Sequence, residues 1–314
     1  MTFTTRLKEE ITSIPVDKID SLVELSAFVR YAAQIKKNKI TLTIENAAVA
    51  RRIYKDIKQN FAVNINITVR IQKRFRIKQI YILEITEKII DILETLNISK
   101  NGKKTLPNSY FLESNADKVS FLKGAFLACG SINDPSTAGY HLEFTSSQKN
   151  EGEFIKKILK EFNITSKILK RVNHYMVYIK SAEMISDLIK LFSATNCFFY
   201  FEDIRIYRDH KNMVNRLNNC EIANQEKILK TGLKQLEVIN YLKEHDLLGL
   251  LDENIQEAIH YRELYPETSL AELADIISKE TGRAIGKSGV NHYFIKIKKL
   301  AENHKAKHNK ESLE

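Results

Sequence analysis

The sequence predicts an α+β protein in which one α-β-α-β-β-α unit occurs twice and an all-helical domain follows. Two observations support the duplication: apolar helical segments at 22–35 and 118–132 each precede a short alternating strand, and basic pairs recur 97 positions apart. A third observation supports the helical domain, because beyond residue 205 the alternating strand pattern disappears. We therefore expect two kinds of domain in this chain.

Each repeat reads as a helix, a strand, an amphipathic helix, a hairpin and a final helix. In the first repeat these segments are 22–35, 40–44, 51–61, 63–84 and 86–95. In the second repeat they are 118–132, 140–144, 153–162, 164–180 and 181–194. Leu25 and Leu122 begin comparable helical stretches, and at the same offset of 97 the pair Lys73-Arg74 falls on Lys170-Arg171. The offset predicts that the two hairpins correspond in register.

Composition changes along the chain predict its boundaries. Asn, Gly, Pro and Ser at 96–113 indicate the connection between repeats, and residues 208–247 read as one long helix or a broken pair. The predicted segments are 1–95 (first repeat), 96–205 (linker and second repeat), 206–250 (connecting helix or helices), 251–302 (helix-turn-helix domain) and 303–314 (polar, frayed tail).

Charge and cysteine content narrow the class of partner. The 314 residues carry a formal net charge of +10, which favours nucleic acid, an anionic membrane surface or an acidic protein, unless the basic surface serves solubility alone. The three cysteines are widely spaced and form neither a disulfide framework nor a zinc pattern, which favours a reducing cytosol. The start of the chain is not a signal peptide, and no apolar run of about 18 residues occurs, so we expect no membrane partner.

The last three predicted helices, at about 253–263, 269–279 and 287–301, contain a helix-turn-helix pattern. Ser269 and Glu272 form a capping box at the start of the middle helix. The apolar stripes of the last two helices comprise Leu270, Leu273, Ala274 and Ile277, then Val290, Phe294, Ile297 and Leu300. The spacing from Gly282 to Gly286 is one residue short of a P-loop, and a helix precedes it, so we expect no nucleotide cofactor.

Polar residues fill the remaining positions of this pattern. Asn and His can bond to base edges, whereas Lys and Ser hold phosphates, and the early residues of a recognition helix enter the major groove. The candidate DNA-binding residues are Ser269, Lys287, Ser288, Asn291, His292, Lys296, Lys298 and Lys299. The alternative interpretation is an ordinary basic helical hairpin.

The helix FLKGAFLACGSI, followed by YHLEF, resembles the LAGLIDADG helix of homing endonucleases. Together with HKNMVNRLNNCEIAN at 210–224 and KSGVNHYFIKIKKLAE, it resembles the WhiA family over essentially the whole chain. The resemblance implies a duplicated LAGLIDADG homing-endonuclease-like αββαββα-type domain followed by a helix-turn-helix of the sigma-factor region 4 type. It also implies a bacterial DNA-binding regulator tied to sporulation, cell division and chromosome segregation, located in the cytoplasm with the nucleoid.

The resemblance also allows the catalytic acids to be sought by position. In a LAGLIDADG enzyme, an acid near the end of each paired helix holds a divalent metal. Matching the terminal Gly of the motif to Gly130 places the acid positions at Cys129 and, in the first repeat, at Ala32, with small interface residues such as Gly124 and Ala27. We therefore expect neither cleavage nor a metal. A redox role for Cys129 is a weaker alternative.

In LAGLIDADG proteins the paired sheets form a saddle over the major groove, and here the hairpins are basic. The candidate saddle residues are Arg70, Lys73, Arg74, Arg76, Lys78, Lys167, Lys170 and Arg171. The alternatives are a solvated basic hairpin and a sheet turned to protein binding.

We expect double-stranded DNA as the partner, with the transcription machinery or another regulator as further candidates, and a monomeric LAGLIDADG part. The competing functions are an active nuclease, which Ala32 and Cys129 contradict, and a nucleoid-architectural or protein-interaction factor without strong sequence preference.

Overall fold

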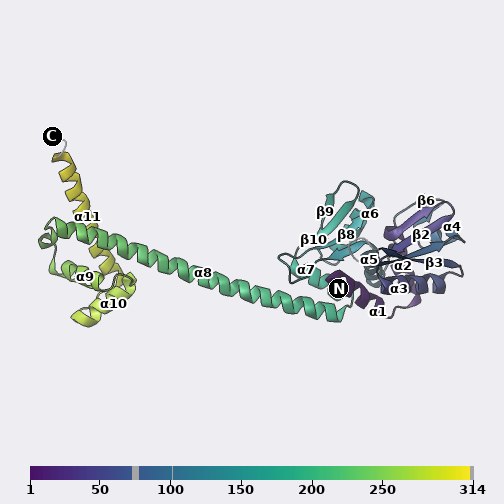
Figure 1. Ribbon diagram of the computed structural model, residues 1–314, viewed down its shortest axis with the longest axis horizontal. Coiled ribbons are helices and arrows are strands. Elements are labelled where there is room, and N and C mark those ends of the chain that lie inside the picture. Colours follow the sequence, from purple (N-terminus) through teal and green to yellow (C-terminus); the bar gives the residue numbers. More distant parts are fainter. Residues whose placement is uncertain (73–77, 101, 312–314) are drawn as a thin grey trace. The chain divides into compact units, whose positions relative to one another are not determined.

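The computed structural model describes residues 1–72, 78–100 and 102–311, and the chain divides into two compact units, 1–209 and 210–314 (Figure 1). The first unit is a mixed helix and sheet domain. Its elements are α1 (Phe3–Ser13), α2 (Lys18–Ala32), β1 (Ala33–Lys36), β2 (Lys39–Ile44), α3 (Ala47–Asn60), β3 (Ile65–Gln72), β4 (Lys78–Ile85), α4 (Ile89–Thr95), β5 (Ser99–Lys100), β6 (Lys103–Lys104), α5 (Asn115–Cys129), β7 (Gly130–Ile132), β8 (Leu142–Ser146), α6 (Lys149–Glu161), β9 (Lys167–Lys170), β10 (Tyr175–Ile179) and α7 (Ala182–Leu191).

The second unit is helical, and the helix α8 (Thr195–Glu244) runs from the first unit into it. Its further elements are the short 3-10 helix η1 (Leu248–Leu250), α9 (Glu253–Leu264), α10 (Leu270–Thr281) and α11 (Lys287–Glu311). The sequence left open whether one long helix or a broken pair follows residue 208, and the structure shows one continuous helix.

The paired helices α2 and α5 lie side by side at the centre of the first unit (Figure 1). Asp17 caps α2 by accepting from the Asp20 N–H, and Ser114 and Asp117 form a capping box on α5. Each helix ends three residues earlier than its apolar pattern suggested, because the chain turns there into the edge strands β1 and β7. The two helices correspond at the predicted offset of 97.

Two four-stranded antiparallel sheets flank these helices, with the orders β1-β2-β4-β3 and β7-β8-β10-β9. Strand residues alternate between the core and the opposite face, as the period of two requires. In β2 the core side holds Ile40, Leu42 and Ile44, and in β8 it holds Leu142 and Phe144. The hydrophobic core of the unit therefore lies between the sheets and helices α2, α3, α5 and α6.

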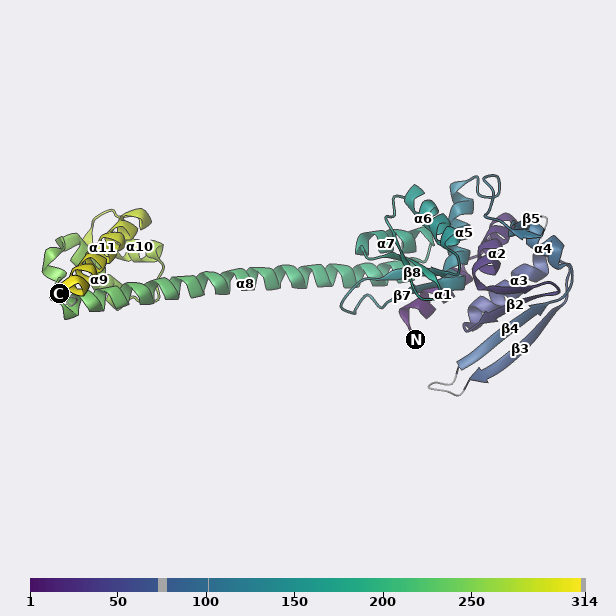
Figure 2. The same ribbon diagram turned by 90° about the horizontal axis from the view of Figure 1, so that it is seen from above.

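Strand register shows that the hairpins do not share the offset of the helices. The row Ala33, Leu42, Leu83, Ile67 crosses the first sheet, and the row Gly130, Phe144, Val177, Ile168 crosses the second. Ala33 and Gly130 are 97 positions apart, but Leu83 and Val177 are 94 apart. The offset of 97 therefore does not hold along the described strands of the hairpins: β3 and β4 (Figure 2) have eight residues each, whereas β9 has four and β10 has five. Lys73 and Arg74 lie outside the described residues, so their match with Lys170-Arg171 stays a prediction.

In the second unit, α9, α10 and α11 pack with the end of α8 around a separate core that includes Ile239, Leu242, Ile259 and Leu273. The last helix continues to Glu311, whereas the sequence predicted a frayed tail over 303–314. Contacts hold the first part of this extension, because the Tyr241 hydroxyl lies 2.9 Å from His304 Nδ1 and Lys305 lies over the Tyr241 ring. Within the described residues, no helix is both long and apolar enough to cross a membrane.

Candidate nucleic-acid interface

The helix pair α10 and α11 is held in a fixed geometry by caps and by the turn between its helices. Ser269 and Glu272 form the predicted capping box, and Gly282 caps the C-terminus of α10 with a φ of +71°, which favours glycine. In the turn, Ser278 Oγ donates to the Ala274 carbonyl at 2.8 Å and accepts from the Ile285 N–H at 3.1 Å. These bonds fix where α11 begins.

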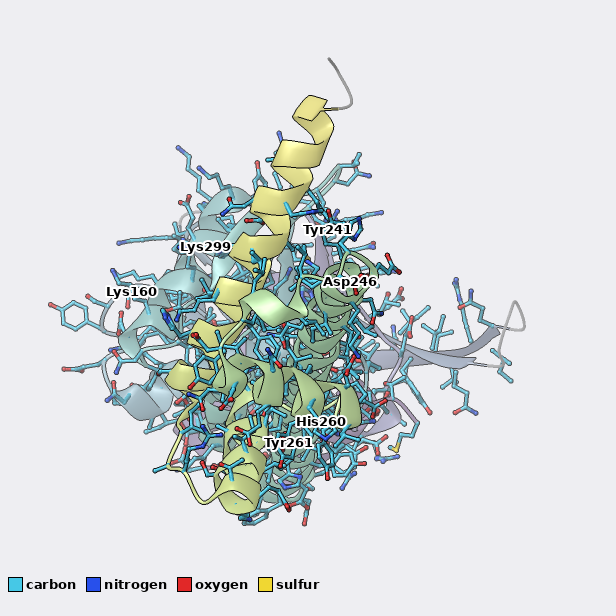
Figure 3. All side chains as sticks on the ribbon, turned by 90° about the vertical axis from the view of Figure 1, so that its left-hand side faces the viewer. Lys160, Tyr241, Asp246, His260, Tyr261 and Lys299 are labelled. Carbon is cyan, nitrogen blue, oxygen red and sulfur yellow. The ribbon has the colours of Figure 1, made fainter. Side chains whose placement is uncertain are left out.

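One side of α11 is buried, as its apolar spacing predicted. Val290, Phe294 and Ile297 lie in the core with Ala301, and Leu300 packs against them from a partly buried position. The predicted contact residues of α11 are all exposed: Lys287, Ser288, Asn291, His292, Lys296, Lys298 and Lys299. Figure 3 shows Lys299 on one side of α11 and Tyr241 on the other.

Helix geometry gathers part of this set on a single face. A turn of about 100° per residue places Ser288, Asn291, His292 and Lys299 on one stripe opposite the buried side. Ile295 lies in the middle of that stripe and is 44% exposed. The sequence prediction did not include Ile295 because only polar residues were considered as DNA contacts. Its spacing of four from Asn291 and three from His292 would have placed it on the same face of the helix. An exposed Ile can contact a thymine methyl group.

The lysines around this face differ in whether an acidic side chain lies near them. Lys296 Nζ lies 3.9 Å from an Asp252 oxygen, and Lys298 Nζ lies 3.6 Å from a Glu302 oxygen, so each has an acidic neighbour. Lys287 is the first residue of α11 and stands beside the N–H groups that begin the helix. A helix N-terminus attracts anions, so this end of α11 is suited to a phosphate.

Among the predicted DNA contacts of the helix-turn-helix, Ser269 is the one residue that lies outside α11. Its hydroxyl accepts from the Glu272 N–H at 3.2 Å, and Glu272 accepts in return from the Ser269 N–H at 2.8 Å. The hydrogen bonds to the Ser269 backbone and side chain hold the pKa of Glu272 below its ordinary value. The observed role of Ser269 is therefore to cap α10.

The outer faces of the sheets, defined as the faces opposite the core, hold some of the predicted saddle residues. Strand register places Arg70 and Lys167 on the outer faces, whereas Lys170 shares the core side of β9 with Ile168. Arg171 lies beyond the end of β9 in the hairpin turn. The residues Lys73, Arg74 and Arg76 and the side chain of Lys78 lie outside the described residues.

Acidic side chains share these outer faces. Glu84 on β4 pairs with Lys39 at 2.5 Å, and Glu143 on β8 lies 2.8 Å from His141 Nε2. The two sheets therefore present mixed charge in their described part, where Arg70 and Lys167 lie on the outer faces and Lys170 and Arg171 are exposed at the end of the second hairpin.

The ends of α2 and α5 meet a cavity of about 1300 Å³ in the first unit. Its lining includes Lys8, Ala32, Glu45, Ala128 and Asp134. Burial lowers the pKa of the Lys8 ammonium, while the Cys129 thiol and Glu45 oppose that shift. The helix ends thus open into a large space that holds both charged and apolar side chains.

Cys129 ends α5 beside this cavity, with its thiol donating to the Ala125 carbonyl at 3.2 Å. Burial raises the pKa of the Cys129 thiol to about 12. Because the thiolate is the reactive form, the raised pKa argues against the redox alternative.

Three family models match the chain in the order that its architecture suggests. The WhiA N-terminal LAGLIDADG-like domain matches residues 18–99, the WhiA LAGLIDADG-like domain matches 118–211, and the WhiA C-terminal HTH domain matches 214–301. The chain belongs to the WhiA family. Its first unit is the duplicated LAGLIDADG-like fold, and its second unit carries the helix-turn-helix.

Relatives of known name agree with this assignment. A protein of Oceanobacillus iheyensis is 38% identical, covering 96% of this chain and 97% of that protein, and one of Bacillus cereus is 37% identical over 96% of each. Both are named probable cell division protein WhiA. The crystal structure of full-length WhiA from Thermatoga maritima has a TM-score of 0.58 and 23% identity over 96% of this chain and 99% of that one, which shows the shared fold.

The LAGLIDADG-like fold raises the question of a divalent metal at the helix ends of this WhiA-family chain. The two acid positions hold the Ala32 methyl group and the neutral Cys129 thiol, and hard cations require oxygen ligands. The Asp134 carboxylate nearby accepts instead from Ser136 in its own loop, at 2.9 Å from the N–H and 2.5 Å from the hydroxyl. The residues at these positions do not fit the metal that the fold suggests.

Proposed function

We propose that this WhiA-family protein binds double-stranded DNA in a sequence-specific manner through α11 and acts as a transcriptional regulator. The observation that carries the proposal is the exposed stripe of Ser288, Asn291, His292, Ile295 and Lys299, which a buried apolar side holds outward. Amide and imidazole groups read base edges, Ile packs on thymine methyl groups, and the flanking hydroxyl and ammonium hold phosphates.

The two units have different parts in DNA binding under this proposal. The second unit reads sequence, and Arg70 and Lys167 add phosphate contacts from the sheets of the first unit. Each neutralised phosphate adds about 0.9 to the slope of log K against log salt. Because its relatives are named probable cell division proteins, we infer that the regulated genes serve cell division. Chromosome segregation and sporulation are further candidate processes, which the family resemblance implies.

The test starts by selecting binding sites from randomised duplexes with the full-length protein. Affinity for the selected site is then measured by fluorescence anisotropy at fixed salt for Lys287→Ala, Asn291→Ala and His292→Ala. We expect each change to cost about 1–3 kcal/mol, because each removes a base or phosphate contact. Asn254→Ala and His260→Ala on α9 are matched controls, since both residues are exposed helix positions of the same types.

Two results would contradict the proposal. Equal affinity for selected and random duplexes would favour a nucleoid-architectural factor without sequence preference. Unchanged affinity in all three α11 variants, with selectivity retained, would place the reader elsewhere in the chain.

A further inference from the structure

A long stretch of α8 in the second unit has no tertiary packing. Every residue from 210 to 227 is exposed, although the helix continues through them without a break. Five of these residues are Asn, which is a poor helix former, and most helices in proteins depend on packing for stability. A helix that only separated two domains would not need so many asparagines. The composition of the stretch therefore indicates a surface that binds another molecule.

The asparagines and the arginine of this stretch gather on one side of the helix. At about 100° per residue, Asn212, Asn215, Arg216 and Asn219 fall within one third of the helix circumference. Lys227 and Lys230 continue the same side two turns later. We call these six residues the amide face.

The amide face is basic over its first part, from Asn212 to Asn219. From His210 to Cys220 the helix contains no acidic residue, and Glu221 projects from the opposite side. Further along, Glu226 lies on the same side as the amide face, where its carboxylate is 4.0 Å from Lys230 Nζ. Within the part of the chain that the structure describes, Asn212, Asn215, Arg216 and Asn219 have no hydrogen bond or ion pair to another side chain. Their donors and acceptors are therefore available to a ligand.

We propose that the amide face is a second DNA-reading element, which lies in a major groove and contacts base edges separately from α11. Asn pairs with adenine and Arg with guanine through two hydrogen bonds each, and an exposed helix fits the width of the major groove. Asn212 to Asn219 spans about 10 Å, which is the length of about three base pairs. This inference rests on the proposed function only in that the protein binds double-stranded DNA.

The apolar residues that flank the amide face do not form a seam for a second helix. Met213, Leu217 and Cys220 lie at spacings of four and three, but the series then continues with the polar Asn224 and with Lys227 of the amide face. A coiled coil needs the apolar series to persist for at least about three heptads. A second copy of the chain is therefore a poorer match than DNA.

The test measures the affinity of the full-length protein for its selected duplex by fluorescence anisotropy. Asn215→Ala, Arg216→Ala and Asn219→Ala are each expected to weaken binding by about five- to one-hundred-fold. Arg216→Lys is expected to recover little of that loss, because Lys keeps the charge but cannot form the two-pronged contact. Asn224→Ala and Gln225→Ala, on the other side of the helix, are the matched controls and should bind as the unaltered protein does.

Alanine favours helix more than asparagine does, so these variants keep α8 intact, and circular dichroism verifies it. Wild-type affinity in the amide-face variants, combined with weak binding by Asn291→Ala, would overturn this inference and leave the proposed function standing. Absence of any preferred duplex for the unaltered protein would overturn both. If Met213→Ser and Leu217→Ser alter the mass measured by light scattering while the amide-face variants bind DNA normally, the stretch binds protein and the inference is wrong.

Discussion

Gly124 sets how closely the central helices of the first unit approach each other. A Cβ atom added at this position would overlap the backbone carbonyl of Glu24 and lie 3.0 Å from the Ala27 Cβ. Gly124 corresponds to Ala27 at the offset of 97, so two small residues of the pseudo-symmetric pair face each other. The sequence predicted small residues here, and the structure shows what they permit.

Gly124→Ala is therefore expected to lower the free energy of unfolding by about 1–3 kcal/mol, because the added methyl group forces α2 and α5 apart. Gly139→Ala is the matched control, since a Cβ at Gly139 meets nothing within 4 Å. Urea unfolding of the full chain, followed by circular dichroism, measures both. A loss in Gly139→Ala as large as in Gly124→Ala would show that helix packing is not the cause.

Glu24 is a buried acid in the same helix pair. The Glu24 side chain is 1% exposed. Arg52 Nε lies 3.6 Å from Glu24 Oε1 and closer, at 3.0 Å, to Asp56 Oδ2. Burial raises the pKa of Glu24 to about 7, with Arg52 opposing the shift. The folded protein thus holds a proton on Glu24 that the unfolded chain releases at lower pH.

This raised pKa predicts a pH dependence of stability with a definite sign. Between about pH 4.5 and 7 the folded state binds more protons at Glu24, so stability falls as the pH rises through this window. The loss is about 3 kcal/mol when complete. Urea midpoints at pH 5 and pH 8 should therefore differ less in Glu24→Gln than in the unaltered protein. An equal difference in both proteins would assign the pH dependence to other groups.

Among the elements, α10 combines a structural and a predicted functional residue. Ser269 was predicted from the sequence both as a helix cap and as a DNA contact, and the hydroxyl is engaged as the cap. Capping is a local property of the chain, so its sequence signal was sufficient. A DNA contact depends on which side chains remain free after folding.

Ser269→Ala is expected to destabilise the second unit by about 1 kcal/mol, because it leaves an N–H of the first turn without its partner. Below the melting temperature, affinity for DNA should change much less than in Asn291→Ala. Thermal melting and anisotropy on the same variant separate the two roles. A large loss of affinity with unchanged melting would assign Ser269 to DNA contact instead.

The hairpins show where element-level prediction failed. The repeated basic pair at 73–74 and 170–171 suggested equivalent positions, yet the rows through Leu83 and Val177 show that the strands correspond at a different offset. Hydrogen-bond register depends on strand and loop lengths, which differ between the hairpins and which local pattern does not report. Only the paired strands could show that Lys170 shares its side of β9 with Ile168, although the Lys170 side chain is exposed.

For the whole molecule, the replaced acids at Ala32 and Cys129 predict a protein that does not cleave DNA. We expect no Mg²⁺- or Mn²⁺-dependent nicking of a plasmid carrying the selected site, because neither side chain can hold a hard cation. A LAGLIDADG enzyme acting on a plasmid with its own site is the positive control. Metal-dependent nicking that Glu45→Gln or Asp134→Asn abolishes would contradict this prediction, since both residues line the cavity at the helix ends.

The sequence by itself determined the duplication, the helix pair with its small residues, the capping box and the polar stripe of α11, because these features follow from local periodicity and side-chain size. Tertiary structure decided which cations of the hairpins face outward, that α8 is one helix and that Glu24 is buried. It also decided that Asn212 to Asn219 stay free of packing. These features depend on which segments, distant in the sequence, pack against each other, and local sequence patterns do not report such contacts.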